Sequence, residues 1–256
     1  MFILKRYYRF YKSNGLIKSI FKIITTPLRI IYKQIYEKNK KKIFSKNSQK
    51  ERFELIYKTN FWSSKESLSG LGSEQKNTIN IKKGIIDIIN NHKIKSILDA
   101  PCGDCNWIQF VVKKNNIKYI GIDIVKECIS KNKSRFNSKK FNFKELDITK
   151  DKLPKSDLFI CRDFMFHLSF EDNMRFLKNI KNLECRYILI SNHSRSAKNN
   201  ILNKNIKTGD FRKINLFKEP FNFKSNYELI IDDHCDGVEK YLILFKIEKL
   251  KKFLKL

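Results

Sequence analysis

The residues best suited to chemistry lie between positions 96 and 123. A short apolar strand is predicted to end at Asp99, Gly103 opens the following turn, and a second apolar strand ends at Asp123. Gly103 lets the backbone approach a ligand closely, and a carboxylate twenty residues later can accept hydrogen bonds from both hydroxyls of a ribose. The spacing therefore predicts a site for a cofactor that contains a nucleoside.

The turn lacks the features of a pyrophosphate site. Such sites use several glycines so that backbone amides and a helix N-terminus face the anion. Here Gly103 stands alone and is followed by Asp104, whose charge would repel a phosphate. S-adenosylmethionine has no phosphate and carries positive charge on its amino group and sulfonium, so acids at Asp99 and Asp104 fit it better.

At these residues the chain resembles the class I methyltransferases, in which one acid ends the first strand and a ribose-binding acid ends the second. Ala100, Cys102 and Cys105 stand where the commonest form of the motif has other small residues. The resemblance implies a cofactor site formed by Asp99, Ala100, Cys102, Gly103, Asp104, Trp107, Asp123, Ile124, Asp147, Ile148 and Arg162. Within this set, it implies that Asp147 accepts from the adenine amino group and that the Ile148 amide serves a ring nitrogen. Capping of a turn by Asp147 is the alternative.

The segment from Arg162 to His167 follows the fourth predicted strand. Enzymes of this class that methylate amines of planar bases usually show Asn or Asp followed by Pro-Pro-aromatic there, and this chain does not. His167 is the predicted catalytic base for a hydroxyl, because an imidazole titrates near neutrality. Asp163 is the second predicted catalytic residue. The alternative is that His167 braces the loop or caps the next helix.

Three residues further along are predicted to bind the substrate. Asp210 and Arg212 lie where this fold commonly inserts recognition loops, and they suit hydroxyls or an anionic group. An ordinary surface turn is the alternative. His193, after the fifth strand, is a reserve candidate. Residues 60–248 resemble a little-characterised bacterial group of methyltransferases, some of which are associated with sugar and surface-glycan pathways.

Alternating strands and helices predict an α/β fold. The expected architecture is Rossmann-like and doubly wound, a mostly parallel seven-stranded sheet ending in an antiparallel hairpin. Helices are expected at about 51–60, 74–91, 105–115, 124–135 and 171–182, and strands at 96–99, 118–122, 141–146, 157–161, 187–192, 227–231 and 241–247. The glycine-containing loop Ser67–Ser73 either covers a ligand or only connects helices.

Length and charge predict one domain with an extension. The 256 residues divide into a basic amphipathic helical extension, 1–50, and a methyltransferase domain, 51–256. The net charge of +28 comes largely from lysine scattered along an Asn-, Ile- and Phe-rich chain, so nucleic acid is disfavoured as a partner. Residues 1–46 nevertheless hold thirteen Lys or Arg and a single acid, Glu37.

The extension has two main interpretations. It either lies on an anionic membrane surface or packs as a helical cap or partner-docking element, and Pro27 is expected to separate two helical stretches. No uncharged run is long enough to span a bilayer or to act as a signal sequence. A cytoplasmic location is predicted, with membrane association on the cytoplasmic face as one option.

Six cysteines without a secretory signal indicate free thiols. The Cys102–Cys105 pair has thioredoxin-like spacing, but a redox role leaves Asp99 and Asp123 unexplained. No bound metal is expected.

The sequence therefore predicts S-adenosylmethionine-dependent O-methylation of a small-molecule or glycan-linked hydroxyl. An RNA methyltransferase and a catalytically silent cofactor-binding or membrane-docked protein are the alternatives.

Overall fold

The computed structural model describes residues 16–253, which fall into two compact units, one within residues 1–45 and the other from Lys46 to the C-terminus. The first contains helix α2, Leu16–Phe44. The expected break at Pro27 is wrong, because the helix continues through this residue. A long helix can tolerate the loss of the one backbone hydrogen bond that proline removes. The part of the predicted extension before residue 16 lies outside the described residues. None of the described helices combines the length and apolarity needed to cross a bilayer.

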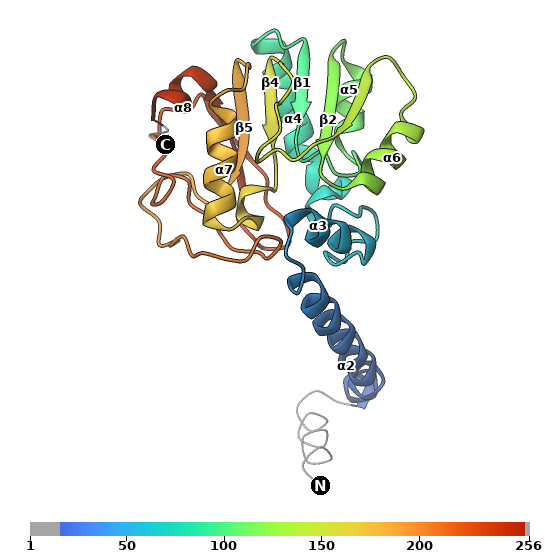
Figure 1. Ribbon diagram of the computed structural model, residues 1–256. Helices are drawn as coiled ribbons and strands as arrows, with labels where there is room; N and C mark the ends of the chain where they lie inside the picture. Colours follow the sequence, from blue (N-terminus) through green and yellow to red (C-terminus); the bar gives the residue numbers. More distant parts are fainter. Residues whose placement is uncertain (1–15, 254–256) are drawn as a thin grey trace. The chain divides into compact units, whose positions relative to one another are not determined.

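The second unit is built on a seven-stranded sheet, as predicted. Its order is β3-β2-β1-β4-β5-β7-β6. Figure 1 shows the consecutive neighbours β2, β1, β4 and β5 side by side. The first five strands are parallel, and β7 pairs antiparallel with both β5 and β6. The strands are β1 Ser96–Asp99, β2 Lys118–Asp123, β3 Phe141–Glu145, β4 Leu158–Cys161, β5 Tyr187–Asn192, β6 Leu229–Asp232 and β7 Tyr241–Lys246.

Apolar residues alternate across the sheet because successive strand side chains point to opposite faces. Ile97 and Leu189 pack on the face covered by α4 and α5, whereas Leu98 and Ile188 pack against α7 and the segment 214–223. The helices of this unit are α3 Gln49–Lys58, α4 Ile79–Asn91, α5 Ile108–Lys114, α6 Lys126–Arg135, α7 Phe170–Ile180 and α8 Ile247–Phe253, with short 3-10 turns η1 Leu71–Ser73, η2 Gln75–Thr78 and η3 Met165–His167.

Three helices begin later than predicted, and the smallest difference is at α6, which starts at Lys126 rather than at about residue 124. The helix expected from residue 74 starts at Ile79 after the turns η1 and η2. The helix expected from Cys105 starts at Ile108, because Cys105 has a left-handed φ of 53° that a right-handed helix cannot contain.

Helix α3 starts at a capping box. The Ser48 side chain accepts from the Glu51 amide, and the Glu51 carboxylate accepts from the Ser48 amide. This cap satisfies two groups at the helix terminus and fixes where α3 begins. The helix lies at the edge of the sheet where the parallel strands end (Figure 1), and there it contacts α6.

Candidate functional site

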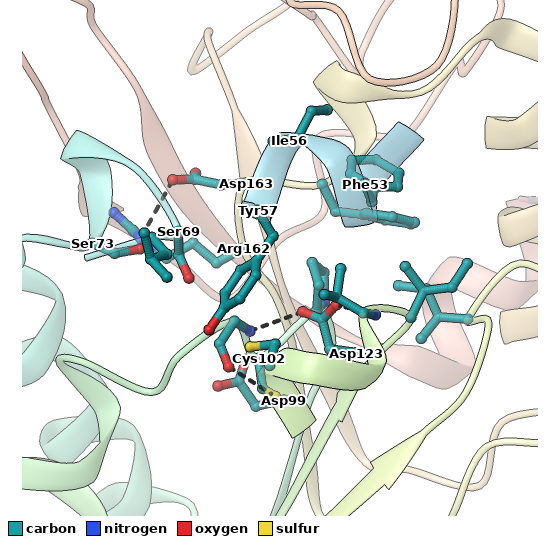
Figure 2. A pocket seen from close by; sticks show the side chains of 18 of the residues that line it. Phe53, Ile56, Tyr57, Ser69, Ser73, Asp99, Cys102, Asp123, Arg162 and Asp163 are labelled. Atoms are coloured by element: carbon teal, nitrogen blue, oxygen red, sulfur yellow. Dashed lines mark hydrogen bonds and ion pairs between the residues drawn. The ribbon is translucent and has the colours of Figure 1, made fainter. Parts of the chain in front are cut away.

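A pocket lies beyond the carboxyl ends of β1, β2 and β4, the usual ligand position in open α/β sheets. Figure 2 shows Asp99, Cys102 and Asp123 on one side of it and Phe53 and Ile56 of α3 on the other. The predicted site residues that line the pocket are Asp99, Cys102, Gly103, Trp107, Asp123, Ile124, Asp147, Ile148, Arg162 and Asp163. Those placed elsewhere are Ala100, Asp104, His167, His193, Asp210 and Arg212.

Asp123 ends β2 and is positioned by the backbone. Its Oδ2 accepts from the Gly103 amide at 3.0 Å, and its Oδ1 accepts from the Val125 amide at 2.9 Å. Burial raises the pKa of this carboxyl to about 6, although these amides favour the ionised form. The Ile124 amide also favours the ionised form, and part of the carboxylate's roughly four acceptor positions stays available for the hydroxyls of a ribose.

Asp99 is the second buried acid of the pocket. Tyr119 donates its hydroxyl to Asp99 Oδ2 at 2.7 Å. Burial raises the pKa of Asp99 to about 7, and the Tyr119 hydroxyl and the Arg162 charge only partly offset this effect. A buried acid with one donor is suited to interact with a cationic group such as the one the sequence predicts here.

Asp104 holds a loop rather than facing the pocket. Its carboxylate accepts from the Ser67 hydroxyl at 2.9 Å, the Leu68 amide at 2.9 Å and the Ser69 hydroxyl at 3.2 Å. Gly103 makes this closure feasible: its φ is 52°, and a Cβ there would lie 2.1 Å from Ser69 Oγ. The loop is thus fastened over the turn that follows β1.

The segment before β1 supplies one wall of the pocket, and sequence reasoning largely missed it. Of the two interpretations of the loop Ser67–Ser73, the structure favours the cover, because Leu68, Ser69 and Ser73 line the pocket. The lining residues that were not predicted also include Gln49, Phe53, Ile56, Tyr57 and Trp62. Their only sequence signal is an ordinary amphipathic helix followed by an aromatic pair.

Four charged side chains form a network at the pocket: Arg162, Asp233 and Lys240 are buried, whereas Asp163 is partly exposed. Arg162 donates to Asp233 through Nε at 2.9 Å and Nη2 at 2.7 Å, and Lys240 Nζ lies 2.6 Å from Asp163 Oδ1. Burial alone would raise the pKa of Asp163, but Arg162 and Lys240 hold it well below its usual range. Asp163 also has a left-handed φ of 55°, a strained conformation of the kind found at functional sites. Its carboxylate is therefore ionised at neutral pH and is a poor proton acceptor there.

His167 lies next to the pocket wall. Trp62, which lines the pocket, stacks on its ring with centroids 5.0 Å apart. His167 Nδ1 is 2.8 Å from the Asp210 carbonyl oxygen; since a carbonyl only accepts, Nδ1 carries the proton and Nε2 keeps a lone pair. Burial lowers the pKa of His167 to about 4, so the expectation that this imidazole titrates near neutrality is wrong; the ring is neutral at pH 7 but is a weaker base than a free imidazole.

The predicted substrate-binding residues are held in the protein interior, apart from Asp210. Arg212 is 6% exposed and donates to the carbonyl oxygen of Leu168 at 2.5 Å, and burial lowers its pKa to about 10. His193 is 2% exposed, and its Nδ1 accepts from the Ile214 amide at 3.3 Å. Both side chains connect the segments that follow β4 and β5 to the segment 208–214.

The cysteine pair belongs to a cluster of buried thiols. Cys102, Cys105 and Cys128 each place their sulfur 3.8–3.9 Å from Asn132 Nδ2. Burial raises the pKa of the Cys102 thiol well above its usual value, which opposes the reactivity of a redox pair. Within residues 16–253, no three His, Cys, Asp or Glu side chains are grouped to hold a metal ion.

Comparison with known proteins identifies the central part of the chain. Residues 97–183 match the family model of a methyltransferase domain. One similar solved structure is magnesium protoporphyrin IX methyltransferase from Synechocystis PCC 6803, with 11% sequence identity, coverage of 66% of this chain and 78% of that chain, and a TM-score of 0.48. Another is the methyltransferase domain of bacterial CtHen1, with 14% identity, coverage of 65% of this chain and 97% of that chain, and a TM-score of 0.49. A third is human N-acetylserotonin methyltransferase, with 13% identity, coverage of 78% of this chain and 56% of that chain, and a TM-score of 0.49. No curated protein matches the chain.

The strand order, the acid that ends β2 and the match over residues 97–183 define a methyltransferase domain with the class I fold. The protein is an S-adenosylmethionine-dependent methyltransferase, and S-adenosylmethionine is its cofactor. The pocket fits this cofactor: Asp123 has acceptor positions to spare, and the buried Gln49 Oε1 has no donor among the described residues.

Proposed function

We propose that this protein transfers a methyl group to a hydroxyl of a small-molecule or glycan-linked acceptor. The state of Asp163 carries the proposal. The Ser191 hydroxyl and the Lys240 ammonium donate hydrogen bonds to its carboxylate, and Arg162 forms an ion pair with it. The acceptor positions of Asp163 are therefore engaged and are not offered to the amine of a planar base. A hydroxyl needs no such acceptor, provided that a neutral base takes its proton.

The chain's own residues would divide the work as follows. Asp123 would hold the ribose, and Asp99 and Arg162 would form the polar floor of the pocket. When bound, S-adenosylmethionine supplies an activated methyl group, so positioning and exclusion of water are the main tasks left to the protein. His167 Nε2 would accept the hydroxyl proton at the edge of the pocket beside Trp62.

The test is an acceptor screen with the full-length protein. Release of S-adenosylhomocysteine is measured with phenols, free sugars, glycolipids, amines and RNA, and mass spectrometry then locates the methyl group. Methylation of oxygen supports the proposal. Methylation of nitrogen alone, or of RNA alone, contradicts it.

We also propose that the enzyme works in the cytoplasm on an anionic membrane surface, through α2. Ile30, Ile31 and Ile35 of this helix are 52–53% exposed, and basic residues such as Arg29 and Lys33 alternate with them. Partition of apolar side chains and attraction of cations to acidic lipids reinforce each other at a membrane interface.

Vesicle binding tests this second proposal. The full-length protein should co-sediment with phosphatidylglycerol vesicles but not with phosphatidylcholine vesicles, and the double variant Ile31→Ser/Ile35→Ser should bind several-fold less. Removal of residues 1–45 should abolish sedimentation. Equal partitioning of full-length and truncated protein would show that α2 is not the binding element.

A further inference from the structure

The carboxylate of Asp147, which follows β3, is largely occupied by donors of the protein itself. Its Oδ1 accepts from the Thr149 amide at 2.9 Å and from the Thr149 hydroxyl at 2.6 Å. Its Oδ2 accepts from Gln49 Nε2 at 2.7 Å and lies 3.5 Å from Lys150 Nζ. A carboxylate offers about four acceptor positions; three hydrogen bonds fill three of them, and the Lys150 ammonium is the nearest cation to the remaining one. The expected contact from Asp147 to the adenine amino group would therefore compete with donors of the protein itself.

Gln49, the first residue of α3, is oriented by this carboxylate. Because Asp147 Oδ2 can only accept, the side-chain atom of Gln49 that faces it must be the amide nitrogen. The same nitrogen lies 3.1 Å from Thr149 Oγ1. The amide oxygen must then point away from Asp147. Within the described residues Gln49 Oε1 is buried without a donor, which is unfavourable unless a ligand supplies one.

A backbone donor lies on the same pocket. Ile148 lines it together with Gln49, and the Ile148 N–H makes no backbone hydrogen bond within residues 16–253. The pocket lining thus contains one acceptor without a donor, Gln49 Oε1, and one backbone donor without a backbone acceptor, the Ile148 N–H. Adenine presents the complementary pair on one edge, the 6-amino group and the acceptor N1. A 6-oxo purine presents the opposite pattern, an oxygen and an N1–H.

We propose that Gln49 reads the 6-amino group of the cofactor's adenine, with Asp147 acting as the positioning residue that fixes the orientation of the Gln49 amide. The proposal rests on S-adenosylmethionine being the cofactor and deepens that assignment. It also places α3 inside the cofactor site, although α3 lies outside the matched residues 97–183. An element that precedes the methyltransferase motifs then decides which nucleobase is accepted.

Two ligands test the proposal by titration calorimetry on the full-length protein: S-adenosylhomocysteine and its 6-oxo analogue, S-inosylhomocysteine. The wild type should bind the adenosyl ligand roughly 10- to 100-fold more tightly, because the oxo group faces Gln49 Oε1 without a proton between them. The near-isosteric Gln49→Met should reduce this preference to about threefold or less. Equal binding of the two ligands by the wild type, or an unchanged preference in Gln49→Met, overturns the proposal. If neither ligand binds the wild type, the cofactor assignment itself fails.

The positioning role of Asp147 has a separate readout. In Asp147→Ala the Gln49 amide is free to turn and donate to a 6-oxo group, so S-inosylhomocysteine should gain affinity relative to S-adenosylhomocysteine. A purely structural role would weaken both ligands by the same factor, and that result contradicts the proposal. Lys50→Ala is the matched control, because the neighbouring side chain pairs with Glu145 and does not line the pocket. It should leave both affinities unchanged.

Discussion

The backbone holds the Asp123 side chain in one orientation. The amides of Gly103 and Val125 fix both carboxylate oxygens, and the residue is only 8% exposed. A preorganised acceptor loses little entropy when a ligand binds, so its hydrogen bonds contribute most of their free energy to affinity.

Replacement of Asp123 should therefore weaken cofactor binding. In Asp123→Ala the affinity for S-adenosylmethionine should fall by about 1.5–3 kcal/mol, the usual contribution of charge-assisted hydrogen bonds. Calorimetry measures the loss, and thermal unfolding shows whether the variant is folded. Asp87→Ala, which removes an exposed acid of α4, is the control. Unchanged affinity would remove Asp123 from the cofactor site, whereas a preference of the wild type for NAD would contradict the cofactor assignment itself.

Replacement of His167 distinguishes two roles for this residue, a catalytic base and a structural residue that braces the loop after β4. As a base, His167→Ala should lower turnover by about 10²- to 10⁴-fold with cofactor affinity nearly intact. The measurement is S-adenosylhomocysteine release with an acceptor found by screening, and His92→Ala, before β1, is the control. Loss of thermal stability without loss of turnover would show that His167 only joins the loop after β4 to the Asp210 carbonyl.

At the scale of elements, the closed position of the loop Ser67–Ser73 depends on Asp104. This carboxylate is the common acceptor for two serine hydroxyls and one amide of the loop, and the loop in turn covers part of the pocket. Closure of the loop and shape of the cofactor site are therefore coupled through one side chain that does not line the pocket.

Asp104→Ala should release that loop. We expect unfolding stability to fall by about 2–3 kcal/mol, because the hydrogen bonds to one charged group are lost together. Limited proteolysis should then cut within residues 64–73, and added cofactor should slow the cleavage. A protease pattern identical to that of the wild type would mean that the loop is held by its other contacts.

At the scale of the whole molecule, two buried acids couple folding to pH. Burial raises the pKa of Asp99 to about 7 and that of Asp123 to about 6, above the values expected in the unfolded chain. The folded protein therefore binds protons more tightly than the unfolded chain between about pH 4 and pH 7. The stabilising effect of these two groups is complete below about pH 4 and is lost as the pH rises through 6 and 7.

This linkage predicts a variant that gains stability with pH. Relative to the wild type, cofactor-free Asp99→Asn should become progressively more stable between pH 5 and pH 8, because its amide has no charge to bury. Urea unfolding at several pH values measures the difference, with Asp87→Asn as the exposed control. A difference that does not change with pH would contradict the raised pKa of Asp99.

Cofactor binding should show the opposite dependence. The ionised acids bind ribose hydroxyls and a cationic ligand, so affinity should fall by roughly fourfold or more between pH 7 and pH 5.5 as Asp123 and Asp99 take up protons. Calorimetry at these two pH values measures the change. Affinity that is constant over this range would show that neither acid needs to ionise.

The sequence by itself determined the sheet and the cofactor class. Strand periodicity is local, and the acids that end β1 and β2 are fixed by the chain that immediately precedes them, so Asp99, Gly103 and Asp123 could be found from spacing alone. The antiparallel pairing of β6 and β7 was likewise predictable, because their connection is too short for a crossover helix.

Only the tertiary structure decided how individual polar groups are used. Asp104 and Asp147 read as ligand contacts in the sequence, but long-range hydrogen bonds from Ser67 and Gln49 occupy their carboxylates. Conversely, Gln49 belongs to no recognisable sequence motif, and the packing of α3 over the strand ends brings it to the pocket. A carboxylate's free lone pairs depend on which distant donors the fold brings within about 3 Å, and no local pattern records those partners.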